Sequence, residues 1–165
     1  MLTNWITNRK MQKLLENISA LSDKEELQLN LQQLKELLFP PFKQVKDCII
    51  ISKKPVDVLE LAYDKSIELN MDKTGYEACC SETRINTYFE SNISMEAGTK
   101  IALMVLEIWA LKLKELQPDS KFCLIIFSDE SCVEIRFHKI HEGESMWLDE
   151  ELEHYKDGAV GYTMI

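Results

Sequence analysis

The sequence predicts an α+β protein in which an N-terminal helical hairpin and a central buried helix pack on a mainly antiparallel β-sheet. Three observations lead to this prediction. Apolar residues recur at helical spacing in residues 1–40, the segment 95–116 is apolar nearly all round, and two strand-like segments at 121–128 and 132–139 are separated by a short turn. Helices that lead into antiparallel strands are typical of the α+β class.

The length of the chain is consistent with one domain. A chain of 165 residues can bury a sizeable core. We therefore expect a single domain over residues 1–165, with a helical hairpin at 1–40 and a strand-helix-strand-strand-helix-strand core at 84–165.

Two helices are predicted in the hairpin. The apolar stripes that define them are Met11, Leu14, Leu15, Ile18 and Leu21 in the first helix, and Leu27, Leu31, Leu34 and Leu38 in the second. Ser22 and Glu25 form a capping box where the second helix begins, and the Pro40-Pro41 pair ends it. We expect the two helices to be antiparallel and to pack on the rest of the domain.

The middle of the chain is less regular. The run 47–52 is rich in β-branched residues and predicts a short buried strand. After Pro55, apolar residues at helical spacing favour a helix through Ile67, with a β-hairpin as the alternative. Residues 84–89 alternate between apolar and polar, which predicts a half-buried strand.

The clearest element is a helix over 95–116. Ser94 is suited to cap it, and the Gln117-Pro118 pair ends it. Its polar stripe consists only of Lys100, Glu107 and Lys114, so the helix should be buried on several sides.

The last quarter predicts more strands and a short acidic helix. The strand at 121–128 is apolar on both faces and should lie inside the sheet. The strand at 132–139 alternates, so Val133, Ile135 and Phe137 should point inward, and Glu134, Arg136 and His138 outward. An acidic helix with Leu148, Leu152 and Tyr155 as its buried seam should end at Gly158, before a final strand.

Composition and charge limit the function. The net charge of -9 and the pI near 4.9 disfavour direct nucleic-acid binding, which needs basic residues, and favour a basic partner. Residues 129–165 hold ten acids and three Lys or Arg, and therefore seven of the nine net negative charges. The longest apolar run, 101–111, is too short to span a membrane.

The cysteines indicate a reducing compartment. Five cysteines with no C-x-x-C spacing, and no signal peptide at the start of the chain, predict a cytoplasmic protein with free thiols.

Two kinds of site are disfavoured by the spacing of the residues. His138 and His141 would share a face on a helix but not on a strand, and no zinc-binding spacing is present, so we expect no metal and no other cofactor. Glu134, Arg136 and His138 would form a polar row suited to acid-base catalysis, but such a row is equally typical of salt links across a sheet surface.

The favoured site is the acidic stretch that follows this row. It combines closely spaced carboxylates, which repel one another, with an aromatic side chain of the kind that anchors interfaces. The predicted binding residues are Glu142, Glu144, Trp147, Asp149, Glu150 and Glu153. The alternatives are a solvated acidic face, and a Trp147 that only pins the short helix to the core.

The order of segments resembles a known class of proteins. "RINTYF", "IALMVLEIWALKLKELQPDSKFCLIIFSDE" and "EIRFHKIHEGESMWLDEELEHYKDGAVGY" succeed one another as in bacterial toxin-immunity proteins, and are most similar to those of contact-dependent growth inhibition systems. The resemblance covers roughly residues 84–165 and provides no functional residues to transfer. It implies a small cytoplasmic protein that binds and blocks the toxic C-terminal domain delivered by a neighbouring cell, often a nuclease.

Together these observations predict a non-enzymatic immunity protein. It would neutralise a cognate toxin C-terminal domain, a basic nuclease, by covering its substrate-binding surface, without touching nucleic acid or membrane. Two alternatives stay open. One is a small enzyme that uses Glu134, Arg136 and His138, and the other is an adaptor that binds through its N-terminal helices.

Overall fold

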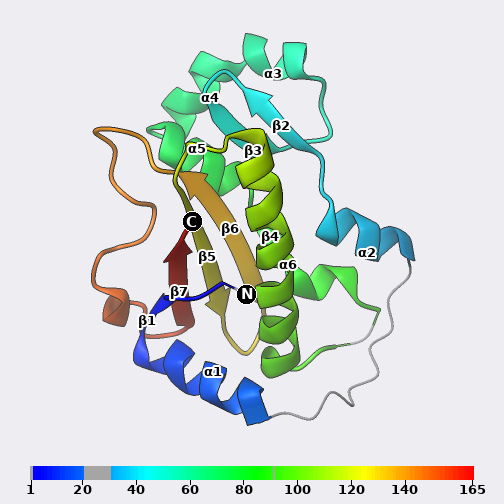
Figure 1. Cartoon of the computed structure of the whole chain (residues 1–165), viewed down its shortest axis with the longest axis vertical. Helices are drawn as coiled ribbons and strands as arrows, with labels where there is room; N and C mark the ends of the chain where they lie inside the picture. Colours follow the sequence, from blue (N-terminus) through cyan, green and yellow to red (C-terminus); the bar gives the residue numbers. More distant parts are fainter. Residues whose placement is uncertain (1, 21–30, 91) are drawn as a thin grey trace.

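The protein is an α+β structure, as predicted (Figure 1). The computed structural model describes residues 2–20, 31–90 and 92–165. Its helices are α1 (Arg9–Ala20), α2 (Leu31–Leu38), α3 (Val56–Leu61), α4 (Tyr63–Leu69), α5 (Lys73–Cys80) and α6 (Met95–Leu116), with 3-10 turns η1 (Ile85–Tyr88) and η2 (Leu152–His154). Its strands are β1 (Ile6–Thr7), β2 (Phe42–Val45), β3 (Cys48–Ile51), β4 (Thr83–Arg84), β5 (Phe122–Ser128), β6 (Val133–Lys139) and β7 (Ala159–Met164).

Five strands form the main sheet, in the order β1-β7-β5-β6-β4, and every neighbouring pair is antiparallel. The central strand β5 pairs with β6 on one side and β7 on the other. This position confirms the prediction that the strand lies inside the sheet. Its two apolar faces are consistent with a strand that is covered on both sides of the sheet.

The first face of the sheet is covered by the long helix α6. Trp109 of α6 is fully buried, and its indole lies edge-on to the rings of Phe42 and Phe137, with centroids 5.7 and 6.0 Å away. The indole Nε1–H donates to the carbonyl of Leu37, 3.1 Å away. The helix has the predicted bounds, and Ser94 caps it by accepting from the amide of Ala97. The prediction of a central buried helix is therefore confirmed.

The two N-terminal helices pack on different partners, so the predicted hairpin is wrong for the residues that the structure describes. Helix α1 packs against β7 and α6, whereas α2 packs against α6 and η1 (Figure 1). Because α6 is apolar nearly all round, each helix can bury its apolar face against it without the other. The predicted capping box at Ser22 and Glu25 lies outside the described residues.

The second face of the sheet is covered by residues 140–158, which we call the acidic segment. Its buried residues Leu148 and Leu152 pack with Cys123, Ile125 and Val160 of the sheet. The predicted acidic helix is wrong, because the only helical turn of this segment is η2. The two leucines reach the sheet from an extended path instead of from one helix face. Gly158 does not end a helix. A Cβ there would lie 2.2 Å from the ring of Phe127, so the close approach of that ring requires glycine.

A small lobe sits at one end of the main sheet. The β2-β3 hairpin and α3 to α5 surround their own apolar cluster, which includes Val45, Ile50 and Tyr63 (Figure 1). The predicted buried strand in 47–52 and the predicted helical region after Pro55 are both confirmed. Helix α5 joins the lobe to the sheet because it contacts both β3 and β6.

The predicted strand over residues 84–89 is wrong. Only Thr83 and Arg84 pair with β6, and the chain then turns into η1. Two side chains favour the turn. The Asn86 amide oxygen accepts from the backbone amide of Val133, and the Thr87 hydroxyl donates to the carbonyl of Arg84.

Candidate functional site

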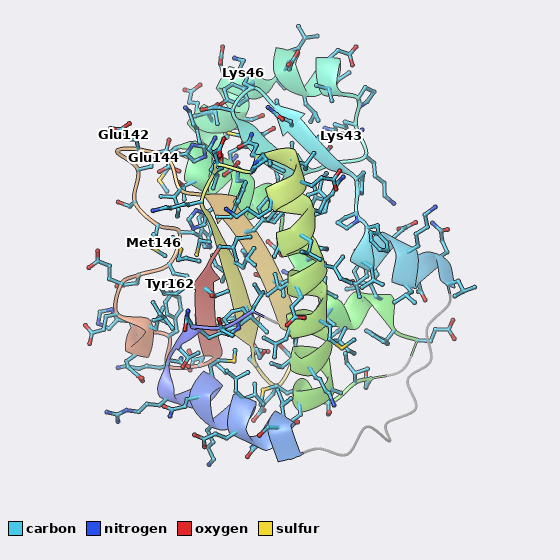
Figure 2. The ribbon with its side chains drawn as sticks, in the orientation of Figure 1. Lys43, Lys46, Glu142, Glu144, Met146 and Tyr162 are labelled. Carbon is cyan, nitrogen blue, oxygen red and sulfur yellow. The ribbon has the colours of Figure 1, made fainter. Side chains whose placement is uncertain are left out.

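The acidic segment exposes only some of the carboxylates predicted to bind a partner. Glu142, Asp149, Glu150 and Glu153 are exposed, whereas Glu144 is only partly exposed, and Glu142 lies at the outer bend of the segment (Figure 2). This exposure follows from the packing beneath. Leu148 and Leu152 are 9% and 5% exposed against the sheet, so the polar residues between and beside them are left on the solvent side.

Glu144 instead caps a helix of the small lobe. Its carboxylate accepts hydrogen bonds from the backbone amide and hydroxyl of Thr74, both at 2.8 Å, and a longer one from the amide of Lys73. Burial opposes its ionisation, but these hydrogen bonds outweigh burial and lower the pKa of Glu144 below its usual value. Glu144 therefore ties the acidic segment to the beginning of α5.

Glu153 and Asp149 also make contacts within the protein. The Glu153 carboxylate accepts from the amide of Arg9 at the start of α1, 2.9 Å away. Asp149 accepts from the amide of Glu151 and pairs with His154. These contacts lower the pKa of Asp149 and raise that of His154. Glu142 and Glu150 are also exposed. Within the described part of the chain, neither of them makes a hydrogen bond or ion pair like those of Glu153 and Asp149.

Trp147 is half-buried and pins the segment to the sheet. The Arg136 guanidinium lies over its ring, with Cζ 5.4 Å from the centroid, a cation–π arrangement. The ring belongs to the cluster formed by the second face of the sheet. Trp147 thus packs on the sheet as the structural alternative expects, although the residue does not belong to a helix, and a binding role for it stays a prediction.

The polar row on β6 is engaged by intramolecular partners. Arg136 pairs with Glu134 at 2.6 Å and with Glu82 at 2.9 Å, and both Glu134 and Glu82 also pair with Arg84. Such a network fixes Arg136 against the sheet surface. The alternative of salt links across the sheet is thus present in the structure.

His138 is buried, although the alternation of the strand predicted an outward position. Its side chain points away from the first face of the sheet, as predicted. The acidic segment covers it on the second face, so the residue is only 1% exposed. Its Nδ1–H is placed to donate to the carbonyl of Lys139, while Nε2 accepts from the amide of Trp147 at 3.5 Å. Burial lowers the pKa of His138, which favours this neutral form.

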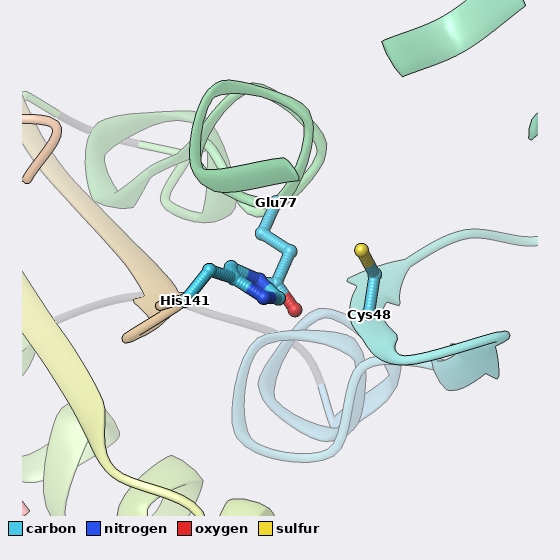
Figure 3. Close-up of side chains that lie close together, drawn as sticks. All are labelled: Cys48, Glu77 and His141. Carbon is cyan, nitrogen blue, oxygen red and sulfur yellow. The ribbon is translucent and has the colours of Figure 1, made fainter. Parts of the chain in front are cut away.

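A second cluster lies where the small lobe meets the sheet, and sequence spacing had not indicated it. Cys48 from β3, Glu77 from α5 and His141 from the acidic segment are all buried, and one ligand atom from each lies within 4.8 Å of the others (Figure 3). The His141 Nε2 is 3.1 Å from a Glu77 carboxylate oxygen. The Glu77 carboxylate also accepts from the amides of Ile49 and Lys139, each at 2.6 Å.

A polar network extends this cluster toward the surface. Asp47 accepts from the Tyr63 hydroxyl at 2.9 Å and from the Lys73 ammonium at 2.6 Å. Burial opposes the charge on Asp47, but these donors outweigh burial and lower its pKa to about 2. The Tyr63 hydroxyl is also 3.5 Å from the Cys48 sulfur, and burial raises the pKa of that thiol to about 12. Cys48 is therefore a neutral thiol and not an activated nucleophile in this state.

The residues of this cluster are far apart in the sequence, so local spacing could not predict that they meet. Glu77 and His141 are 64 positions apart, and Cys48 comes from a third segment. Each residue alone has the pattern of a core or loop residue. The one available signal was a glutamate within a buried helix face, since a buried carboxylate needs partners.

The fold and the site define an α+β protein whose sheet carries helices on one face and an irregular acidic segment on the other. The sequence model of the Uncharacterized protein PM0498 family matches residues 6–164, and the chain belongs to this family. No curated protein matches the chain, and no solved structure does. The resemblance to immunity proteins therefore stays a prediction.

None of the helices in the described parts of the chain has both the length and the apolar composition needed to cross a bilayer.

Proposed function

We propose that the protein is a cytoplasmic immunity protein that neutralises a cognate toxin by binding the toxin's basic C-terminal domain, a nuclease, through the acidic segment. The observation that carries the proposal is that this segment buries its apolar side chains and exposes most of its acidic ones. Its apolar residues Leu148 and Leu152 are buried on the sheet, while Glu142, Asp149 and Glu150 face solvent. The core thus holds an acidic surface in one conformation before any partner binds, which reduces the entropy lost on binding.

The mechanism is steric and electrostatic. Nuclease substrate clefts carry Lys and Arg to hold phosphates, and carboxylates at a similar spacing can pair with those cations. A bound acidic segment would then occupy the place of the nucleic acid. The net charge of -9 adds long-range attraction that speeds the encounter.

The polar row on β6 supports a non-enzymatic role. The Arg136 guanidinium and the buried His138 ring are both held by partners within the protein, as described above. A catalytic pair needs at least one group that can reach a substrate.

The test is a binding and protection experiment with the C-terminal domain of the protein encoded next to this gene. The variant is Glu142→Lys/Glu150→Lys, and the control is Glu60→Lys/Glu68→Lys, which changes the charge equally at exposed positions of the small lobe. Association rates are measured at low and high salt. At low salt, we expect the acidic-segment variant to associate at least about tenfold more slowly than the unchanged protein. The association rate of the control should change much less.

Cell protection provides the second readout. If the variant in the acidic segment binds and protects as well as the control does, the segment is not the docking surface. If the unchanged protein neither binds the neighbouring domain nor protects against it, the immunity proposal itself fails.

A further inference from the structure

The cluster of Cys48, Glu77 and His141 joins three distant parts of the chain at one buried point. Cys48 is the first residue of β3, Glu77 lies in the middle of α5, and His141 lies near the beginning of the acidic segment. The first two residues are fully buried and His141 is 8% exposed. A thiol, an imidazole and a carboxylate have thus been removed from water together, away from the exposed carboxylates discussed above.

These three groups are the side chains that bind zinc in proteins. Zinc bonds of about 2.0 to 2.3 Å in tetrahedral geometry place neighbouring ligand atoms about 3.3 to 3.5 Å apart. The His141 and Glu77 atoms are 3.1 Å apart, and the sulfur lies within 4.8 Å of both. A rotation or shift of the Cys48 side chain by about 1 Å would complete a three-ligand set.

Two contacts around the cluster would orient Glu77 as a metal ligand. Backbone amides of Ile49 and Lys139 hold the two oxygens of Glu77 from two different strands. Outer contacts of this kind orient a ligating carboxylate. A carboxylate offers about four lone-pair positions, so the metal can take the place of the His141 hydrogen bond without disturbing the two amides.

The Cys48 sulfur also has a neighbour suited to a thiolate. The Tyr63 hydroxyl, 3.5 Å away, donates to Asp47 in the present arrangement and can turn to donate to a negatively charged sulfur. The Asp47 carboxylate keeps its ion pair with Lys73 when this happens.

We propose that Cys48, Glu77 and His141 form a binding site for a divalent metal ion of the zinc class. The Cys48 thiol loses its proton to solvent as the sulfur–metal bond forms, neutral His141 binds through Nε2, and Glu77 binds through one oxygen. Three protein ligands leave one position of a tetrahedral ion for a water molecule. No electron is transferred. The bound ion fastens the small lobe and the beginning of the acidic segment to the end of β6, and this inference does not depend on the proposed function.

The experiment uses the full chain and zinc ions. Purified protein is stripped of metal and titrated with zinc in competition with a chromophoric chelator. We expect one tightly bound zinc per chain. Cys48→Ser should weaken binding by more than about a hundredfold, because loss of a ligand exceeds the effect of losing an outer contact. Cys123→Ser is the matched control, since Cys123 is also fully buried but lies in an apolar cluster, and it should leave the affinity unchanged.

Cobalt provides a readout that does not depend on the stability of the Cys48 variant. In a chain whose more exposed cysteines Cys79, Cys80 and Cys132 are replaced by serine, bound cobalt should give a thiolate-to-cobalt charge-transfer absorption. Absence of this band, or an unchanged zinc affinity in Cys48→Ser, would overturn the proposal. In that case the three residues act as a hydrogen-bonded link alone.

Discussion

The two faces of the main sheet are covered in different ways. On the first face, regular helices bury large side chains such as Trp109 and Leu113 without exposure. On the second face, the irregular acidic segment places only a few apolar side chains on the sheet, and it leaves most of its carboxylates exposed. The first face supplies most of the core. The second face has fewer apolar contacts and carries a charged surface that is held in place by them.

This difference separates stability from recognition. A change on the first face should affect the whole fold, because many neighbours share its contacts. A change on the second face should affect the position of the acidic segment first, since unfolding of a region with few buried contacts is local. The changes below test that division.

The largest effect is expected for Trp109→Ala on the first face. It removes a fully buried ring and the hydrogen bond to the Leu37 carbonyl. We expect a loss of about 3 to 5 kcal/mol in the free energy of unfolding, measured by urea denaturation. A loss below about 1 kcal/mol would show that α6 is not the centre of the core.

A smaller effect is expected for Leu152→Ala on the second face. The side chain is 5% exposed, and the irregular segment can move inward to fill part of the space. We expect a loss near the lower end of the range for buried leucine, about 2 kcal/mol. Hydrogen exchange should speed up mainly within residues 140–158, and equal acceleration in β5 would contradict the division between the faces.

The third effect depends on pH and concerns His138. Its pKa is lowered in the folded protein by burial, so the unfolded chain binds a proton more readily. Stability should therefore be complete above the unfolded pKa, near 6.5, and should decrease as the pH falls toward the lower folded pKa. Urea midpoints compared just above and below this range should show a smaller decrease in His138→Gln than in the unchanged protein.

The smallest effect is expected for Glu142→Gln/Glu150→Gln. Both side chains are exposed, and their removal relieves repulsion within the acidic segment. The free energy of unfolding should stay within about 0.5 kcal/mol of its original value, measured in the same urea titration. A large loss of stability would mean that these carboxylates hold the fold together, and they would then be poor candidates for a free docking surface.

Much of the fold was predictable from local pattern. The bounds of α6, the inner position of β5 and the strand β7 follow from apolar periodicity and caps, which act within a few residues. The errors in local structure were of two kinds. Alternation predicted a strand at Asn86 and Thr87, where the structure has a 3-10 turn. Periodicity predicted a helix in the acidic segment, which instead follows an extended path.

The candidate site was predictable only in part. The sequence located the acidic surface, but it did not separate Glu142 and Glu150 from Glu144 and Glu153, which accept hydrogen bonds at the beginnings of α5 and α1. Those partners lie far away along the chain, so no local pattern contains them.

By itself, the sequence determined the fold class, the central helix and the concentration of negative charge near the C-terminal end, because each depends on composition or on short-range periodicity. Only the tertiary structure decided that the N-terminal helices separate around α6, that His138 is covered, and that Cys48, Glu77 and His141 meet. These outcomes depend on which surfaces bury the most apolar area together, a competition among segments far apart in the chain.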